Sequence, residues 1–295
     1  MGWESTIALE GPLDAALAKS EARFADLRPD HGKEVIWAGQ PDVQTDISVV
    51  YVHGFSASKA EIRPVPDRVA GHFGANLFFT RLPGHGRNER AMGETELSEW
   101  YACLDEALEV GTRIGKRVVL ISCSTGGTLV AAGLSDIARQ KDVSATVFVA
   151  PNFRVNSRLI NLALVPGAAH WMERVAGQRY SFEPRNEEQA RWWTTSYPPS
   201  SAVPMVQLVR DVKKASLENI KVPALALFSD ADQVVDARAT HKTLARWGGS
   251  VTRVPVPEGE GVDALSHVVM GDIVSRANTD WGVTEIVSWL KHQLP

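Results

Sequence analysis

Seven short and continuously apolar runs recur along this chain, and they restrict its possible folds more than any other feature. They lie at residues 34–39, 47–52, 76–82, 117–122, 144–150, 223–229 and 250–256. Strands that are buried on both faces have this continuous apolar character, which is typical of a parallel sheet covered by helices. The sequence therefore predicts a mostly parallel sheet at the centre of the molecule.

The segments between these runs have the periodicity of helices. Apolar residues in 97–111 recur at i, i+3, i+4 and i+7, the spacing of one helix face. The segment after Gly126 and the C-terminal VTEIVSWLKHQL have the same spacing, and a helix begun by Pro12 precedes the first run. Repeated alternation of strand and helix predicts a right-handed, doubly wound α/β sheet.

One interval interrupts this alternation. About seventy residues separate the run that ends at Ala150 from the run that begins near Pro223, whereas most connections are a few residues long. The interval has no strand pattern of its own. Four short segments in it suit helices, at residues 158–165, 170–175, 187–197 and 205–212. We therefore predict a core domain of residues 1–151 and 216–295, with a helical cap of residues 152–215 inserted between two strands.

Composition and charge exclude several classes of protein. The 295 residues include 31 basic and 35 acidic side chains without a basic run, so nucleic acid is not the expected partner. No stretch approaches the ~20 apolar residues of a membrane span, and the N-terminus lacks the pattern of a signal peptide. Two cysteines, Cys103 and Cys123, are too few for a disulfide framework. We expect a cytoplasmic monomer or homodimer without integral membrane association.

Polar sequences with side chains that could take part in a reaction follow three of the predicted strands. HGFSAS follows 47–52, CSTGG follows 117–122, and DADQVVD follows 223–229. In an open α/β sheet, ligands bind beyond the carboxyl ends of the strands. The sequence therefore predicts a reactive site at this edge of the sheet.

The turn after 117–122 contains the candidate nucleophile, Ser124. A strand that turns directly into a helix strains the corner residue, and only small residues two positions away on either side avoid a collision. Ser122 and Gly126 occupy those positions. The following helix directs its free N–H groups at the corner, where they favour negative charge. A nucleophilic Cys123 is disfavoured because Thr125 would take the place of the second small residue.

A nucleophilic serine needs a base to accept its proton and an acid to orient that base. Asp232, in SDADQVVD, and His267, in LSHVVM, follow the serine in the sequence and are the candidates. Asp230 and Asp236 compete for the role of the acid, although Asp236 begins a predicted helix, where an aspartate is common as the N-cap. The other histidines stand in turns, on helices or near the chain end.

Together these motifs resemble the α/β-hydrolase family. SCSTG (122–126) is similar to its nucleophile elbow, G-x-S-x-G, with serine for the first glycine, and the order Ser, Asp, His is the order of that family. The acid and histidine loops resemble those of bacterial carboxylesterases and monoacylglycerol lipases. RLPGHGR (81–87) is similar to a turn that packs beside the active site in these proteins. The resemblance extends from residue 47 to the C-terminus, except for the insertion.

The resemblance implies a serine hydrolase that cleaves carboxylic esters through an acyl-enzyme. Ser124 would attack the ester, His267 would act as the base and Asp232 would orient it. The backbone N–H groups of Phe55 and Thr125 would form the oxyanion hole. No metal or organic cofactor is implied, and the expected substrates are small to medium apolar acyl or aryl esters, including monoacylglycerols.

The insertion and the fold leave alternatives open. Trp171, Trp192 and Trp193 are candidate substrate-binding residues, but aromatic residues of a cap can equally form its own small core. The same triad hydrolyses thioesters, amides and C–C bonds, or transfers acyl groups, in other proteins of this fold. A non-catalytic binding module is a further alternative, although such relatives usually lack one member of the triad.

Overall fold

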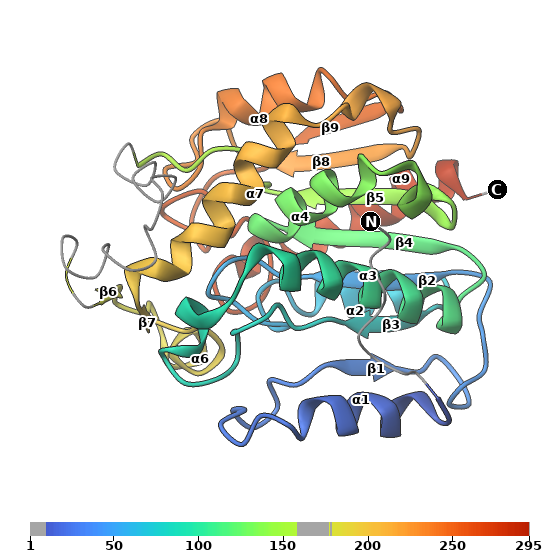
Figure 1. Ribbon diagram of the computed structural model, residues 1–295. Coiled ribbons are helices and arrows are strands. Elements are labelled where there is room, and N and C mark those ends of the chain that lie inside the picture. The colour runs from blue at the N-terminus through green and yellow to red at the C-terminus, as the bar shows by residue number, and fades with distance from the viewer. Residues whose placement is uncertain (1–9, 158–176, 178, 295) are drawn as a thin grey trace.

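The computed structural model describes residues 10–157, 177 and 179–294, and a seven-stranded sheet forms its centre (Figure 1). The strand order is β1-β3-β2-β4-β5-β8-β9. β1 pairs antiparallel with β3, and every other neighbouring pair is parallel. The predicted mostly parallel α/β sheet is confirmed. Its strands are β1 (Glu34–Ile36), β2 (Ser48–Val52), β3 (Asn76–Phe79), β4 (Val118–Cys123), β5 (Val143–Val149), β8 (Ala224–Phe228) and β9 (Val251–Pro255).

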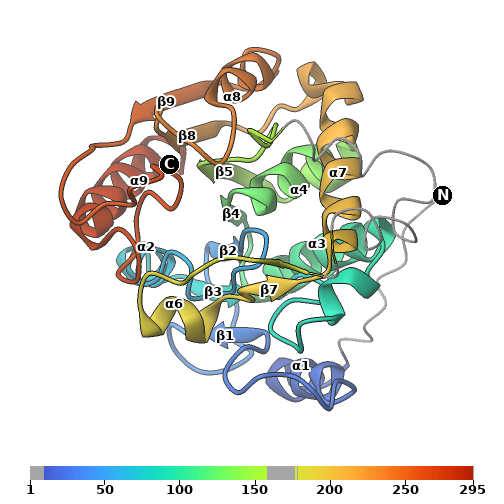
Figure 2. The same ribbon diagram turned by 90° about the vertical axis from the view of Figure 1, so that its left-hand side faces the viewer.

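Helices cover both faces of this sheet (Figures 1 and 2). One face packs against α1 (Leu13–Glu21), α3 (Leu97–Ile114), α4 (Thr125–Leu134), α7 (Ala202–Lys214) and α8 (Ala237–Leu244). The other packs against α2 (Val65–His72) and α9 (Thr279–Gln293). Short 3₁₀ helices are η1 (Ala91–Glu94), η2 (Ile137–Gln140), η4 (Pro199–Ser201), η5 (Leu217–Asn219) and η6 (Arg276–Asn278). None of the described helices is both long and apolar enough to cross a membrane.

The strand β2 shows why its sequence is apolar throughout. Val50 and Val52 belong to the hydrophobic cluster under one layer of helices, whereas Val49 and Tyr51 belong to the cluster under the other. Successive side chains of a strand point to opposite faces, so a strand buried on both faces needs an apolar residue at each position. The chain therefore reaches the site loop at 53–56 from a rigid, fully buried element.

The described part of the predicted insertion differs from expectation in one respect. β6 (Tyr180–Ser181) and β7 (Ser196–Tyr197) form an antiparallel ribbon, so the prediction of an interval without strands is wrong there. α6 (Glu187–Trp192) lies between these strands in the sequence, and the helix predicted over 187–197 ends at Trp192. Figure 2 shows α6 and β7 in front of β2 and β3. Two further predicted helices, near 158–165 and 170–175, lie outside the described residues.

The last helix of the predicted insertion is anchored in the core. Met205, Leu208 and Val212 of α7 are buried in the same cluster as residues of α3 and α4. The last helix of the proposed cap therefore belongs to the helical layer that covers the sheet.

Gly126 allows α4 to begin directly against the end of β2. A Cβ at this position would stand 2.2 Å from the carbonyl oxygen of Val52. We expect Gly126→Ala to lower the free energy of unfolding by about 1–3 kcal/mol, because the helix has to move away from the strand. Urea unfolding measures this change.

Gly71→Ala is the matched control for that substitution. Gly71 also lies in a helix, α2, but an added Cβ there has no neighbour within 4 Å. We expect this variant to gain about 0.4–1 kcal/mol from the lower entropy of its unfolded chain. Equal changes in the two variants would contradict the close approach of α4 to β2.

Candidate active site

Ser124 lies at the corner between β4 and α4. Its backbone angles, φ 48° and ψ −116°, are in a region that is unfavourable for any residue with a side chain. Four backbone hydrogen bonds hold it there: Ser124 N donates to Val149 O (2.9 Å), while Ser124 O accepts from Gly127 N and Asn152 N (both 3.0 Å) and from Thr128 N (3.3 Å). The neighbouring strand and the first turn of the helix thus support the strained corner.

His267 lies between Ser124 and Asp232 and is hydrogen-bonded to both. The distance from Ser124 Oγ to His267 Nε2 is 2.9 Å, and that from His267 Nδ1 to Asp232 Oδ2 is 2.7 Å. Because a carboxylate can only accept, Nδ1 carries the proton and Nε2 is available to accept one from Ser124. Ser124, His267 and Asp232 are only 6%, 9% and 7% exposed, respectively. The structure therefore brings the three predicted catalytic residues into one chain of hydrogen bonds.

The Asp232 carboxylate is itself held in place by the backbone. Its Oδ1 accepts hydrogen bonds from Val234 N (2.8 Å) and Val235 N (2.9 Å). This arrangement leaves Oδ2 for His267 and fixes the direction from which it approaches the imidazole.

The two aspartates that competed for this position have other partners. Asp230 accepts hydrogen bonds from His241 (2.8 Å) and from Arg253 (2.7 Å). These hydrogen bonds and the charge of Arg253 lower the pKa of its exposed carboxyl group. Asp236 is the N-cap of α8 and accepts from Arg238 N (3.1 Å), as the sequence suggested. Neither carboxylate contacts His267 through a hydrogen bond.

A second buried carboxylate, Asp263, supports the loop that carries His267. Its Oδ2 accepts from His267 N (3.1 Å) and Val268 N (2.8 Å), and its Oδ1 accepts from Leu265 N (2.9 Å). Arg185, which precedes α6, forms an ion pair with the same carboxylate. Sequence reasoning missed Asp263, because a single aspartate four residues before a histidine is not a motif.

The electrostatic surroundings of His267 favour its charged form. Burial acts to lower the pKa of His267, but the hydrogen bond to Asp232 and the negative charges of Asp232, Glu61 and Asp263 outweigh it. The pKa of His267 is therefore raised, as suits a base that has to hold a proton during a reaction.

The two predicted oxyanion-hole residues flank the nucleophile. Thr125 is the first residue of α4, and Phe55 lies in the loop after β2. This loop lies against Ser124, since a Cβ added at Gly54 would stand 3.1 Å from Ser124 Cβ. Within the described part of the chain, neither the Phe55 nor the Thr125 backbone N–H donates a hydrogen bond. Unengaged N–H groups are what an oxyanion hole requires.

Two buried histidines tie the loop after β2 to its surroundings. His53 Nδ1 donates to Gly54 O (2.8 Å) and its Nε2 accepts from Leu82 N (3.1 Å). His85 Nε2 accepts from Ser56 N (3.0 Å). Burial lowers the pKa of His53 well below its usual value and that of His85 to about 4, so both rings are neutral at pH 7. They therefore serve as hydrogen-bonding supports of the loop.

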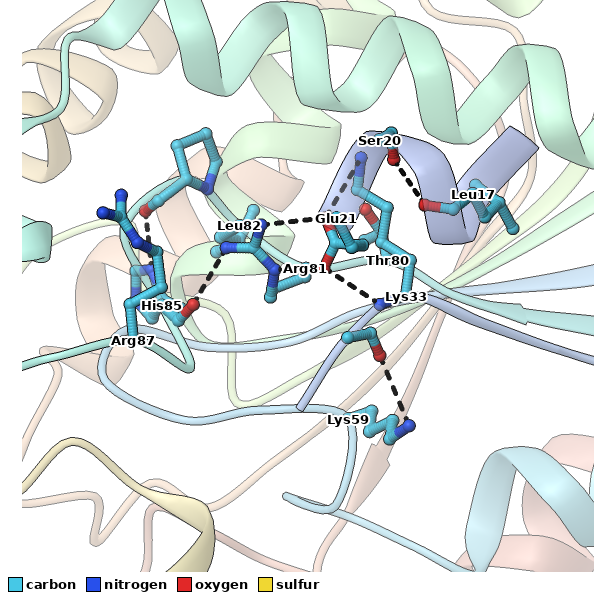
Figure 3. Close-up of polar contacts among 12 residues, drawn as sticks. Leu17, Ser20, Glu21, Lys33, Lys59, Thr80, Arg81, Leu82, His85 and Arg87 are labelled. Atoms are coloured by element: carbon cyan, nitrogen blue, oxygen red, sulfur yellow. Dashed lines mark hydrogen bonds and ion pairs between the residues drawn. The ribbon is translucent and has the colours of Figure 1, made fainter. Parts of the chain in front are cut away.

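A buried ionic network anchors the turn that carries His85 (Figure 3). Arg81 pairs with both carboxylate oxygens of Glu21 in α1 (2.6 and 2.9 Å) and donates to His85 O (2.9 Å). Lys33 lies between Glu21 (3.9 Å) and Glu106 (2.5 Å). The turn 81–87 is thus fixed by an ion pair with α1.

Aromatic residues of the insertion were predicted to contact substrate. Trp171 lies outside the described residues. Trp192 is half-buried at the end of α6, and Trp193 is buried. Tyr197 of β7 lies edge-on to Phe55, with 5.2 Å between the ring centroids. Among the aromatic residues of the insertion that the structure describes, Tyr197 is the one in ring contact with the loop beside the nucleophile.

The thiol next to Ser124 is not suited to act as a nucleophile. Cys123, next to Ser124, is fully buried, and burial raises the pKa of its thiol well above the usual value. Within the ranges that the structure describes, no group of three or more His, Cys, Asp or Glu side chains is arranged to hold a metal ion.

Comparison with known proteins adds three findings. Residues 49–274 match the model of the Alpha/beta hydrolase family. The chain is 25% identical over 191 residues to the thermostable monoacylglycerol lipase of Bacillus sp. (strain H-257), which covers 64% of this chain and 72% of the lipase. Its fold is similar to a solved structure of the metagenome-derived lipolytic enzymes LipS and LipT, with a TM-score of 0.72 and 17% identity over 90% of this chain and 99% of that one.

A second solved structure gives a similar result. The monoacylglycerol lipase of Paleococcus ferrophilus superimposes with a TM-score of 0.62 and 16% identity, over 88% of this chain and 98% of that one. At these identities the superpositions establish a shared fold.

Proposed function

This chain belongs to the alpha/beta hydrolase family, and on that premise we propose that it is a serine esterase that hydrolyses carboxylic esters through an acyl-enzyme. The observation that carries the proposal is the hydrogen-bonded chain from Ser124 Oγ through His267 to Asp232. The curated lipase relative and the lipolytic structures with the same fold support an ester substrate.

The proposed reaction uses each member of this chain in turn. Ser124 Oγ attacks the ester carbonyl while His267 Nε2 takes its proton, and the resulting tetrahedral intermediate collapses with transfer of that proton to the leaving alcohol. Water then attacks the acyl-enzyme, again giving its proton to His267, and Ser124 is released with the acid product. Asp232 keeps the proton on Nδ1 and stabilises the imidazolium that forms twice in the cycle.

The N–H groups of Phe55 and Thr125 are proposed to bind the oxyanion of both intermediates. A donor that meets the oxygen only after it becomes charged stabilises the transition state more than the substrate. Loss of one such donor typically costs a factor of about 10² to 10³ in kcat. Thr125 also lies at the N-terminus of α4, where the helix dipole adds to this effect.

The proposed substrates are small to medium apolar acyl or aryl esters, including monoacylglycerols. Support comes from the two monoacylglycerol lipases among the relatives, and from the aromatic side chains of Phe55 and Tyr197 that meet beside the nucleophile. Trp192 and Trp193 are proposed to shape the approach to this site from the insertion.

Hydrolysis of p-nitrophenyl esters from acetate to dodecanoate, with a monoacylglycerol series alongside, tests this proposal. We expect turnover with an optimum in acyl length. No turnover of any ester by a well-folded chain, together with turnover of thioesters or amides, would reject the ester substrate and retain the triad.

The raised pKa of His267 predicts the pH dependence of this activity. Because the reaction needs neutral His267, kcat/KM falls as the pH decreases through that pKa, and the midpoint lies above the ordinary histidine value of about 6.5. Asp263→Asn removes one of the charges that raise the pKa, so its midpoint is expected at lower pH than in the wild type. A pH profile of kcat/KM measures both values.

Asp280→Asn is the matched control for this shift. Asp280 is an exposed carboxylate on α9, paired with Arg68, and its removal should leave the midpoint unchanged. Asp263→Asn could also disturb the loop that carries His267, which would lower the maximum kcat/KM of the pH profile. Only the lost negative charge would shift the midpoint of that profile. An unmoved midpoint in Asp263→Asn would contradict the electrostatic role of this carboxylate.

A further inference from the structure

Glu61 is a buried carboxyl group beside the active site that the proposed mechanism does not use. It follows β2 by a few residues and is only 3% exposed. Among the described residues, no lysine or arginine forms an ion pair with it. A carboxyl group that loses its contact with water and gains no cation is costly, so its retention calls for a physical reason.

The contacts of Glu61 all lead to the loop beside the nucleophile. Its Oε2 accepts two hydrogen bonds, from Gly54 N (2.7 Å) and from the Tyr51 hydroxyl (2.8 Å). Its Oε1 occupies the space beside Gly54 in which a side chain would lie, since an added Cβ there would stand 2.6 Å away. Burial raises the pKa of Glu61, and the buried thiol of Cys123 lies next to the carboxyl group.

Gly54 is the residue whose conformation sets the direction of the Phe55 N–H. The carbonyl of Gly54 and the N–H of Phe55 belong to one planar trans peptide unit, so they point in opposite directions. His53 Nδ1 holds that carbonyl (2.8 Å), and Glu61 holds the N–H on the other side of Gly54. Glycine has the widest choice of φ and ψ of any residue, so both of its peptide units have to be held from outside.

The residue after Phe55 is held equally firmly. Ser56 N donates to His85 Nε2 (3.0 Å), and Ser56 O accepts from Thr194 N (2.7 Å), which follows α6. The peptide groups on both sides of Phe55 are therefore engaged, while its own N–H is not. This is the arrangement of a donor prepared for a ligand that arrives from outside the chain.

We propose that Glu61 is a positioning residue of the oxyanion hole: by accepting from Gly54 N–H it fixes the loop 53–56 so that the Phe55 N–H faces the reacting carbonyl. This inference rests on the proposed function and specifies one part of it. Its physical basis is preorganisation, because a donor that is already aligned costs no rearrangement when charge develops. Tyr51 donates a second hydrogen bond to the same Glu61 oxygen but does not contact Gly54 through it.

Glu61→Leu tests this role by removing the acceptor while retaining a buried side chain of similar volume. We expect kcat for a p-nitrophenyl ester to fall by about 10² to 10³, the loss that follows removal of one oxyanion donor, with KM changed by less than about threefold. Glu61→Gln keeps an oxygen that can accept from both donors, so its kcat should remain within about fivefold of the wild type.

Tyr51→Phe is the matched control for disturbance of the same buried region. It removes a hydrogen bond to Glu61 but leaves the bond from Gly54 N in place, so kcat is expected to stay within about threefold of the wild type. If Glu61→Leu does not fold, Glu61→Asp takes its place. The shorter side chain remains polar but cannot reach Gly54 N, so the same selective loss of kcat is expected.

Hydrogen exchange of the Gly54 and Phe55 amides, followed by NMR, measures the loop without any substrate. Glu61→Leu should accelerate exchange of the Gly54 amide, and Glu61→Gln should restore its protection. An active wild type whose kcat survives Glu61→Leu, or a Glu61→Gln variant as impaired as Glu61→Leu, would overturn the inference and leave the esterase proposal intact. A wild type that hydrolyses no ester, but loses Gly54 protection in Glu61→Leu, would reject the esterase and support the positioning of the loop.

Discussion

Ser124→Ala is expected to reduce kcat for ester hydrolysis by a factor on the order of 10⁵ to 10⁶, with little change in KM. The covalent route is lost completely without the Oγ atom, and His267 has no group from which to take a proton. Knocking out the nucleophile of a serine hydrolase costs about as much as removing the whole triad. The p-nitrophenyl ester with the best acyl length provides the assay, with active-site titration to exclude carry-over of wild-type enzyme.

Ser122→Ala is the matched control, because it removes a buried hydroxyl only two residues before Ser124 in the sequence. The Ser122 hydroxyl donates to Val147 O (3.1 Å) within the sheet and does not face the histidine. We expect kcat within about threefold of the wild type and a small loss of stability, since one buried hydrogen bond contributes about 1 kcal/mol. Retention of activity by Ser124→Ala would reject the nucleophile and with it the acyl-enzyme.

The second large effect is expected at the acid. Asp232→Asn should reduce kcat by about 10⁴, although the side chain keeps its shape. The amide can donate to His267 Nδ1, which moves the proton of the imidazole to Nε2, and Nε2 can then no longer accept from Ser124. It also removes the charge that stabilises the imidazolium. Steady-state kinetics at a pH above the His267 midpoint isolate this loss from the change in ionisation.

Asp230→Asn and Asp236→Asn are the controls that the sequence itself offers. Both aspartates belong to the same short stretch, but Asp230 pairs with His241 and Arg253, and Asp236 caps α8. Asp230→Asn should leave kcat unchanged, while Asp236→Asn should affect stability by less than about 1 kcal/mol, because asparagine is nearly as good an N-cap. A loss of 10⁴ in either control, and not in Asp232→Asn, would move the acid to that position.

The central strands β2, β3, β4, β5 and β8 could be located from the sequence because they are buried on both faces and need apolar residues almost throughout, whereas the edge strands β1 and β9 are more exposed. The same signal fails for β6 and β7, which have two residues each and are exposed or half-exposed, so no run of apolar residues marks them. The predicted helix over 187–197 is too long for a related reason. Its aromatic residues suit either state, and the hydrogen bond from Thr194 N to Ser56 O draws the chain out of the helix.

For the site, the residues proposed to react could be predicted from the sequence, whereas the residues proposed to support them could not. Ser124, Asp232 and His267 lie in turns or loops that follow strands, and the residue types around them form motifs. Glu61 and Asp263 instead contact backbone N–H groups, which any sequence provides. An isolated acidic residue in a loop is usually exposed, and only the structure reveals that these two are buried. The choice among Asp230, Asp232 and Asp236 likewise depended on the three-dimensional direction of each side chain.

The contacts that lead from Glu21 through Arg81 and His85 to Ser56 bear on where an expression fragment of this protein should begin. The family match starts at residue 49, and α1 lies before it. Glu21 of α1 is the counter-charge of the buried Arg81 guanidinium. Arg81 in turn donates to His85, which accepts from Ser56 of the loop 53–56. A fragment trimmed to the matched region would lack Glu21, and with it the ion pair that holds the Arg81 guanidinium beside His85. The boundary of the family match is therefore narrower than the set of residues that supports the loop 53–56, and expression fragments or domain fusions of this protein should retain α1.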